Sequence, residues 1–212
     1  MTEAGEPARR IDVSPARLPR WLDGFDSRHP GVTRSRADDR VTLTSVDGAS
    51  AVVWVPFPPL TGELVEHCTR SRRLGLVLVR RGGYAVGVLE GSTLTDSKVG
   101  SRHVQGKTKA GGWSQQRFAR RRDNQARVAW QAAADATHAV LAARAGNLDG
   151  LVTGGDRSAV TAVLADPRLR QLAALPRGRW LPVPDPRRRV LEKAAMDARN
   201  IDIDVVDPHS SH

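Results

Sequence analysis

Large apolar residues early in the chain recur at helical spacing and then give way to strand-like runs. A helix is predicted from Ser14-Pro15, a favourable N-cap and first helical residue, to the break at Pro30-Gly31. Residues 41–46 and 51–57 are β-rich and are joined by Asp47-Gly48, which is typical of a hairpin turn. Residues 1–60 are therefore expected to form a small N-terminal module of a helix and a hairpin.

The next part of the chain shows a series of strand patterns. Residues 74–80 and 84–89 are β-rich runs on either side of Arg81-Gly82-Gly83, and a third run over residues 92–104 alternates loosely. These runs follow an extended, proline-rich connection over residues 56–62. Three consecutive strands in a meander are therefore predicted.

One long helix is predicted to follow the meander. Residues 114–144 contain neither Pro nor Gly, and the helix would be roughly 45 Å long. Apolar residues fall close to one face of it, at Ala126, Ala129, Trp130, Ala133, Ala136, Val140 and Leu141. A strand over residues 151–153, with Asp156 capping the helix after it, and further short helices up to residue 198 complete an α/β pattern. Residues 61–212 are therefore predicted to form one domain.

Composition adds charge and compartment to this picture. The 212 residues are 40% hydrophobic, enough for one sizeable core, and carry a formal net charge of +10. A positive field of this size favours phosphate-rich partners, with nucleic acid preferred over a membrane surface because no apolar run approaches the length of a bilayer. Cys68 is the only cysteine and no signal-type segment begins the chain, so a reducing, cytoplasmic location is expected.

The positive charge is concentrated between Lys98 and Arg127, which hold nine Lys or Arg residues against one acid, Asp123. Within this stretch, Gly111-Gly112 permit a backbone that approaches a ligand closely. RNA contacts are expected from Lys98, Arg102, Lys107, Lys109, Trp113, Arg117, Arg120, Arg121 and Arg122. Trp113 either stacks on a base or folds back onto the protein to anchor the loop.

Two glutamines follow the glycines, and they are the candidate catalytic residues. The amide of Gln115 donates and accepts hydrogen bonds at once, and although it is not a general base it can orient a water for attack on an activated ester. Gln116 is an alternative to it. On the residues alone, the stretch is also compatible with a basic RNA-binding loop in which the glutamines are incidental.

Other candidate sites in the sequence are less favoured than this glycine-glutamine loop. Gly154-Gly155 after a strand would suit a phosphate, but a tight turn is the preferred interpretation. His103 is expected to contact phosphate or to have no role, and Cys68 to be a packed apolar residue. An RNase H-like nuclease would need clustered acids around a metal, and the acids here are scattered, at Asp96, Asp123, Asp135 and Asp156. No metal site and no cofactor is predicted.

Residues 111–125 read G-G-W-S-Q-Q-R-F-A-R-R-R-D-N-Q. They resemble the loop and helix start of the central domain of eukaryotic and archaeal class-one peptide-chain release factors, which carry Gly-Gly-Gln and an R-F-A-R-x-R helix start. Here Trp113 stands at the position of the family's glutamine. The displaced Ser114-Gln115 pair is closer to the bacterial, actinobacterial-type branch of the Vms-like release-factor family of peptidyl-tRNA hydrolases.

This resemblance implies a fold, an activity and partners. The fold would be α/β, a mixed five-stranded sheet with helices of the RNase H-like type found in the release-factor central domain. Gly111, Gly112 and either Gln115 or Gln116 would hold a water that attacks the ester of peptidyl-tRNA on stalled large ribosomal subunits, against ribosomal RNA. A non-catalytic ribosome- or tRNA-binding factor is the alternative. The oligomeric state stays open.

Overall fold

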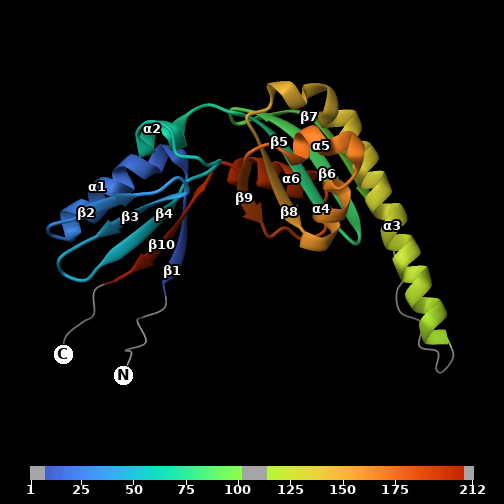
Figure 1. The fold of residues 1–212 in the computed structure, drawn as a ribbon, viewed down its shortest axis with the longest axis horizontal. Helices are drawn as coiled ribbons and strands as arrows, with labels where there is room; N and C mark the ends of the chain where they lie inside the picture. Colours follow the sequence, from blue (N-terminus) through green and yellow to red (C-terminus); the bar gives the residue numbers. More distant parts are fainter. Residues whose placement is uncertain (1–7, 102–113, 208–212) are drawn as a thin grey trace. The chain divides into compact units, whose positions relative to one another are not determined.

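The structure, a computed structural model, describes residues 8–101 and 114–207 (Figure 1). The chain divides into two compact units, residues 1–70 with 199–212 and residues 71–198. Each unit contains one five-stranded sheet with helices against it. The expected α/β class with a mixed five-stranded sheet is confirmed.

The first unit is built on an antiparallel sheet. Its strands, in spatial order, are β1 (Arg9–Val13), β10 (Ile201–Val206), β4 (Ser50–Trp54), β3 (Arg40–Thr44) and β2 (Thr33–Arg36). The predicted hairpin is confirmed as β3 and β4, and Gly48 in its turn has a φ of 90°, which favours glycine. The predicted helix is confirmed as the 3-10 turn η1 (Pro15–Arg17) and α1 (Leu18–Arg28). A short helix, α2 (Leu64–Thr69), ends the unit's first segment.

The core of the first unit lies between α1 and the sheet. Leu18, Leu22 and Phe25 of the helix are buried in the same apolar cluster as Leu43 and Val53 of the hairpin. Cys68 is also buried in this cluster, as expected for a small apolar residue.

The division of the chain differs from the boundary expected after residue 60. Residues 61–70 belong to the first unit, and the chain returns to that unit at residue 199. The reason is strand β10, whose Ile201, Ile203 and Val205 alternate with aspartates and point into the core of the first unit. Strand β1 likewise begins at Arg9, where no element was predicted.

The second unit contains the mixed sheet. Its strands, in spatial order, are β7 (Thr93–Ser101), β6 (Gly83–Glu90), β5 (Arg73–Arg80), β8 (Gly150–Gly155) and β9 (Arg177–Leu181). The first three form the predicted antiparallel meander, whereas β8 and β9 run parallel to β5. The expected mixed five-stranded sheet therefore lies in this unit. Strand β9 was not predicted.

Helices cover both faces of this sheet. Helix α3 (Ser114–Leu141), the turn η2 (Ala142–Asn147) and α4 (Arg157–Leu164) pack on one face, where Val77, Val79, Val86 and Val88 are buried. Alternate residues of β5 and β6 point to the other face, where Leu191 of α6 (Arg188–Asp197) lies close to Gly87. A turn, η3 (Pro167–Leu169), and α5 (Arg170–Ala173) connect α4 to β9. Within the described residues, no helix is both long enough and apolar enough to cross a bilayer.

Candidate functional site

Helix α3 positions the predicted site at the end of a long arm. Its C-terminal part is packed into the core, with Ala133, Thr137 and Leu141 fully buried. From Ala133 back to Ser114 the helix covers about 28 Å at 1.5 Å per residue. Figure 1 shows this N-terminal part extending past the edge of the sheet. Residues at the start of α3 are therefore held away from the body of the unit.

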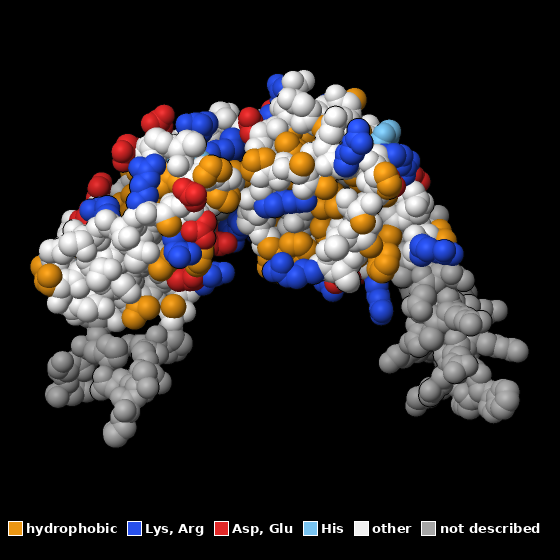
Figure 2. Space-filling view, viewed as in Figure 1, with side chains coloured by type: hydrophobic (Ala, Val, Ile, Leu, Met, Phe, Trp, Pro, Cys, Tyr) orange, Lys and Arg blue, Asp and Glu red, His pale blue; other side chains and the backbone are white. Residues whose placement is uncertain are grey.

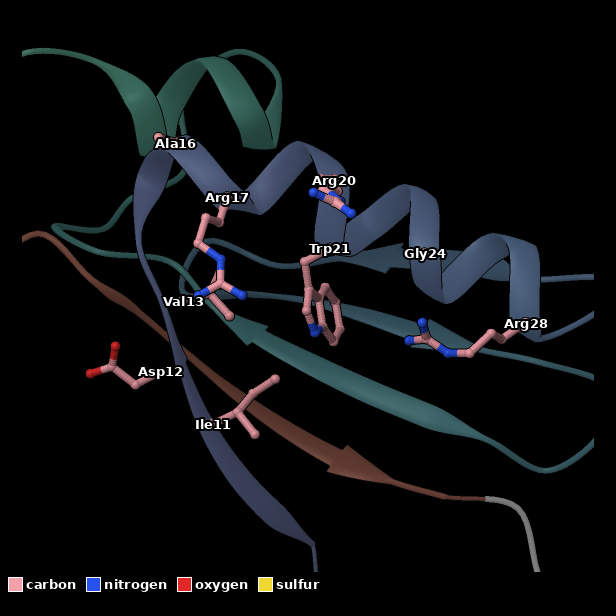
Figure 3. A pocket seen from close by; sticks show the side chains of 9 residues that line it. All are labelled: Ile11, Asp12, Val13, Ala16, Arg17, Arg20, Trp21, Gly24 and Arg28. Atoms are coloured by element: carbon pink, nitrogen blue, oxygen red, sulfur yellow. The ribbon is translucent and has the colours of Figure 1, made fainter.

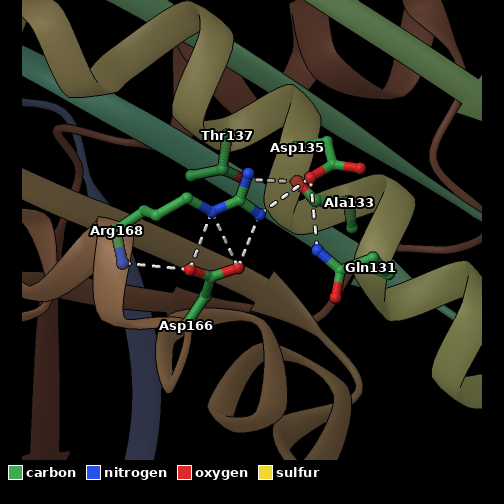
Figure 4. Close-up of polar contacts among 6 residues, drawn as sticks. All are labelled: Gln131, Ala133, Asp135, Thr137, Asp166 and Arg168. Carbon is green, nitrogen blue, oxygen red and sulfur yellow. Dashed lines mark hydrogen bonds and ion pairs between the residues drawn. The ribbon is translucent and has the colours of Figure 1, made fainter.

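The base of this arm is tied to the rest of the unit by one arginine (Figure 4). The Arg168 guanidinium donates to Asp135 of α3 at 2.8 Å and to Asp166 at 2.7 Å, and the Gln131 amide donates to Asp135 at 3.2 Å. The Arg168 side chain, followed by the Arg168 backbone N–H, holds the pKa of Asp166 at about 2. The same guanidinium lowers the pKa of Asp135. Sequence reasoning missed this cluster, for which Asp166-Pro167-Arg168 is the only local signal.

Strand β7 supplies the other approach to the predicted site. Lys98 is exposed on this strand, three residues before the strand ends at Ser101. The strand is held by two arginines from other elements: Arg188 of α6 donates to the Ser97 hydroxyl at 2.7 Å, and Arg144 lies 3.0 Å from the Asp96 carboxylate. Lys98, the first residue of the basic stretch, therefore lies on a strand whose position is fixed by contacts with other elements.

The remaining predicted residues fall into two groups. Helix α3 begins at Ser114, as predicted, so its first turns contain Gln115, Gln116, Arg117, Arg120, Arg121 and Arg122, whose side chains lie outside the described part of the structure. Arg102, His103, Lys107, Lys109, Gly111, Gly112 and Trp113 lie outside the described residues altogether. The helix start is confirmed, and the roles of these side chains stay predictions.

Three of the four acids considered for a nuclease are held by arginines instead of by one another, and the side chain of the fourth, Asp123, lies outside the described part of the structure. Asp96 and Asp135 pair with Arg144 and Arg168, and the Asp156 carboxylate lies 3.6 Å from Arg80. In the part of the chain whose side chains are described, no group of three His, Cys, Asp or Glu residues is arranged to hold a metal ion. The nuclease interpretation gains no support from these positions.

Gly154 and Gly155 are explained by packing. A Cβ on Gly154 would overlap the Leu181 carbonyl oxygen of the neighbouring strand, and one on Gly155 would overlap that of Val79. Gly155 also has a φ of 98°. The preferred turn interpretation therefore accounts for both glycines. Asp156 occupies the predicted N-cap position of α4, but its carboxylate accepts a hydrogen bond from the Arg81 backbone N–H and makes no cap bond to the helix.

Charge is divided very unevenly between the two units. By sequence, the second unit holds 23 Lys or Arg residues and 10 acids, a net charge of +13, whereas the first holds 10 arginines and 13 acids, a net charge of −3. In Figure 2 the second unit accordingly shows many Lys and Arg side chains and few acids. The attraction for a polyanion therefore belongs to the unit that carries α3.

Comparison with known proteins gives one family. The model of the family described as "Actinobacteria/chloroflexi VLRF1 release factor" matches residues 72–204, a span that includes α3 and the whole mixed sheet. Among solved structures, the archaeal translation termination factor aRF1 is similar over 90% of this chain and 66% of its own, at 15% identity and a TM-score of 0.35. A search of curated proteins finds no significant match.

Proposed function

Because this chain belongs to the Actinobacteria/chloroflexi VLRF1 release-factor family, we propose that it is a peptidyl-tRNA hydrolase, an ester hydrolase that works in the cytoplasm. Membership of the family indicates a release-factor-type function on ribosomes. The proposal adds that the substrate is peptidyl-tRNA on stalled large subunits, and that ribosomal RNA is the polyanion met by the basic unit. The match over residues 72–204 is the observation that carries it.

The proposed reaction is hydrolysis of the ester between nascent peptide and tRNA ribose. A water held by the amide of Gln115, or of Gln116, attacks the ester carbonyl carbon, and the bond from that carbon to the ribose oxygen breaks. One proton of the water ends on the ribose oxygen, leaving a peptide carboxyl group and a free tRNA hydroxyl. A neutral amide suffices because the ester is already activated, so that orienting the water and stabilising developing charge with fixed dipoles are the tasks left to the protein.

The geometry of the second unit supports this proposal in two ways. Helix α3 begins one residue before Gln115 and extends beyond the sheet of its unit, which is compatible with entry of the first turn of the helix into a confined site. The net charge of +13 on the same unit supplies the attraction to RNA. An arm with a fixed base is what a positioning mechanism needs.

The test is single-turnover release of a labelled peptide from peptidyl-tRNA on stalled large subunits. Wild type is compared with Gln115→Ala, Gln116→Ala and the control Gln125→Ala, which changes a glutamine further along the same helix. The working glutamine is expected to show release slower by at least about a hundredfold, the loss typical of one fixed polar group in an active site. Binding to the subunits, measured by co-sedimentation, is expected to be unchanged.

Two results would count against the mechanism. If wild type binds large subunits and releases no peptide, the protein is a non-catalytic ribosome-binding factor. If wild type is active and Gln115→Ala and Gln116→Ala are both as fast as Gln125→Ala, the water is held by another group.

A further inference from the structure

The first unit contains a cavity of about 730 Å³ between helix α1 and strand β1 (Figure 3). Strand β1 contributes the three consecutive residues Ile11, Asp12 and Val13, and the opposite wall comes from α1 and the turn before it. None of this cavity belongs to the unit proposed to act on peptidyl-tRNA. It is therefore a candidate for a separate function.

Strand β1, which borders this cavity, lies at the edge of its sheet. It is an edge strand, paired with β10 on one side and with no other strand among the described residues. In Figure 3 Ile11 and Val13 point toward α1 while Asp12 points away, as expected for a strand. Residues of both side-chain directions nevertheless line the cavity, so it borders the edge of the strand and not one face alone. Along such an edge, the N–H and C=O groups not used by the neighbouring strand are available to a further strand.

The helical wall carries a row of arginines around one aromatic ring. Arg17, Trp21, Gly24 and Arg28 follow at steps of three and four residues and so share one face of the helix, with Arg20 beside them. Arg17, Trp21 and Arg28 point into the space between α1 and β1 (Figure 3). A Cβ on Gly24 would lie 3.2 Å from the Arg28 guanidinium, so the small residue leaves room for that side chain.

These arginines differ from four others in the first unit. Four elsewhere in the unit form ion pairs with acids, at Arg10, Arg34, Arg40 and Arg70. Arg17, Arg20 and Arg28 are exposed, and within the described residues none of them pairs with an acid. In a unit with a net charge of −3, these three arginines line one cavity. Their fork-shaped guanidinium groups are suited to carboxylates.

Trp21 contributes an apolar surface to the cavity lining. Its ring stacks on Phe25 with a centroid distance of 5.6 Å and an interplanar angle of 25°, and Phe25 is buried in the core. The indole is thereby held in place while remaining partly exposed beside Ile11. An apolar side chain of a ligand would pack here between the basic groups.

We propose that this cavity binds an extended acidic peptide of a partner protein. The peptide adds a strand to the open edge of β1, its carboxylates pair with Arg17, Arg20 and Arg28, and an apolar side chain packs on Trp21. Strand addition uses the open edge of β1 and the side chains of the opposite wall together. Single-stranded RNA would also meet arginines and an aromatic ring, but it makes no use of a strand edge, and the unit's negative net charge repels a long polyanion.

The experiment is chemical-shift mapping on the ¹⁵N-labelled full chain with an eight-residue peptide of alternating Glu and Val. Amide signals of residues 9–13 and 17–28 are expected to shift, and the outward-facing β1 amides to exchange more slowly with solvent. The triple variant Arg17→Gln, Arg20→Gln, Arg28→Gln is expected to raise Kd at least about tenfold. Its matched control, Arg34→Gln, Arg36→Gln, Arg40→Gln, removes the same charge at the other edge of the sheet and is expected to bind as wild type.

Three comparisons can overturn the proposal. It fails if the Glu/Val peptide shifts no β1 amide at millimolar concentration, or if a Lys/Val peptide binds equally well. It also fails if methylating alternate peptide nitrogens has no effect in either register, since strand pairing would then be absent. If an oligouridine of eight nucleotides binds these residues more tightly than the acidic peptide, the cavity is an RNA site.

Discussion

The Asp166 carboxylate has a measurable consequence for stability at low pH. Hydrogen bonds from Arg168 hold its pKa at about 2 in the folded protein, below the value of about 3.9 for an unperturbed aspartate. A depressed pKa contributes stability above the unfolded value, and this contribution is lost as the pH falls through the folded value. At neutral pH we therefore expect Asp166→Asn to be less stable than wild type. The difference should shrink between about pH 4 and about pH 2.

Urea unfolding of the two proteins across this pH range measures the effect. A stability difference that is the same at pH 6 and pH 2 would show that the Asp166 carboxylate is not held by Arg168 in solution. It would also remove the evidence that this cluster fixes the base of α3.

Gly155 provides a second prediction for a single residue. We expect Gly155→Ala to destabilise the second unit by roughly 3 kcal/mol or more, because the new Cβ both meets the Val79 carbonyl oxygen and opposes a φ of 98°. The control is Gly146→Ala, where a Cβ has no neighbour within 4 Å and the expected change is about 1 kcal/mol or less. Denaturant unfolding compares the two. Equal stabilities would mean that Gly155 is not needed for packing.

Among the elements, α3 combines a packed base with an extended arm, and a proline separates their contributions. Asn124→Pro interrupts the helix between the two parts. The residues from Ser114 to the proline are too few to form a stable helix alone. We expect lower helical content by circular dichroism and loss of peptide release, with the unfolding midpoint of the second unit unchanged because Ala133 and Leu141 keep their packing. Asn124→Ala is the control. Unchanged release by the proline variant would show that a continuous arm is not required.

Elements with strong local patterns were predictable from the sequence, and the others depend on distant partners. Periodicity predicts helix α3, including its start at Ser114, and turn residues predict the hairpins. Strand β9, R-G-R-W-L, has no alternation and is a strand because β8 lies beside it. Strand β10 alternates from Ile201 to Val205, but no local pattern indicates that its partners are β1 and β4, more than 140 residues earlier. The candidate glutamines were found by resemblance, since no local pattern distinguishes a catalytic amide from a solvated one.

For the whole molecule, the uneven charge predicts how binding responds to salt. Replacing Arg120, Arg121 and Arg122 with Ala is expected to weaken binding to large subunits and to flatten the dependence of log K on log salt. Each lost phosphate contact should reduce the slope by about 0.7 to 0.9. The control is Arg34→Ala, Arg36→Ala, Arg40→Ala in the first unit, which should leave the slope unchanged. An unaltered slope in the first variant would show that those arginines of α3 face solvent.

Strand β10 also determines the order in which the protein takes shape during its synthesis. The sheet of the first unit has a gap between β1 and β4 until residues 201–206 fill it. Those residues are translated only after the entire second unit, residues 71–198. Domains usually fold in the order in which they emerge, the N-terminal one first. Here residues 1–70 emerge first but cannot complete their sheet, and its apolar face stays uncovered until β10 is made. The second unit, although it is made later, has all of its own strands by residue 198 and can bury its core first.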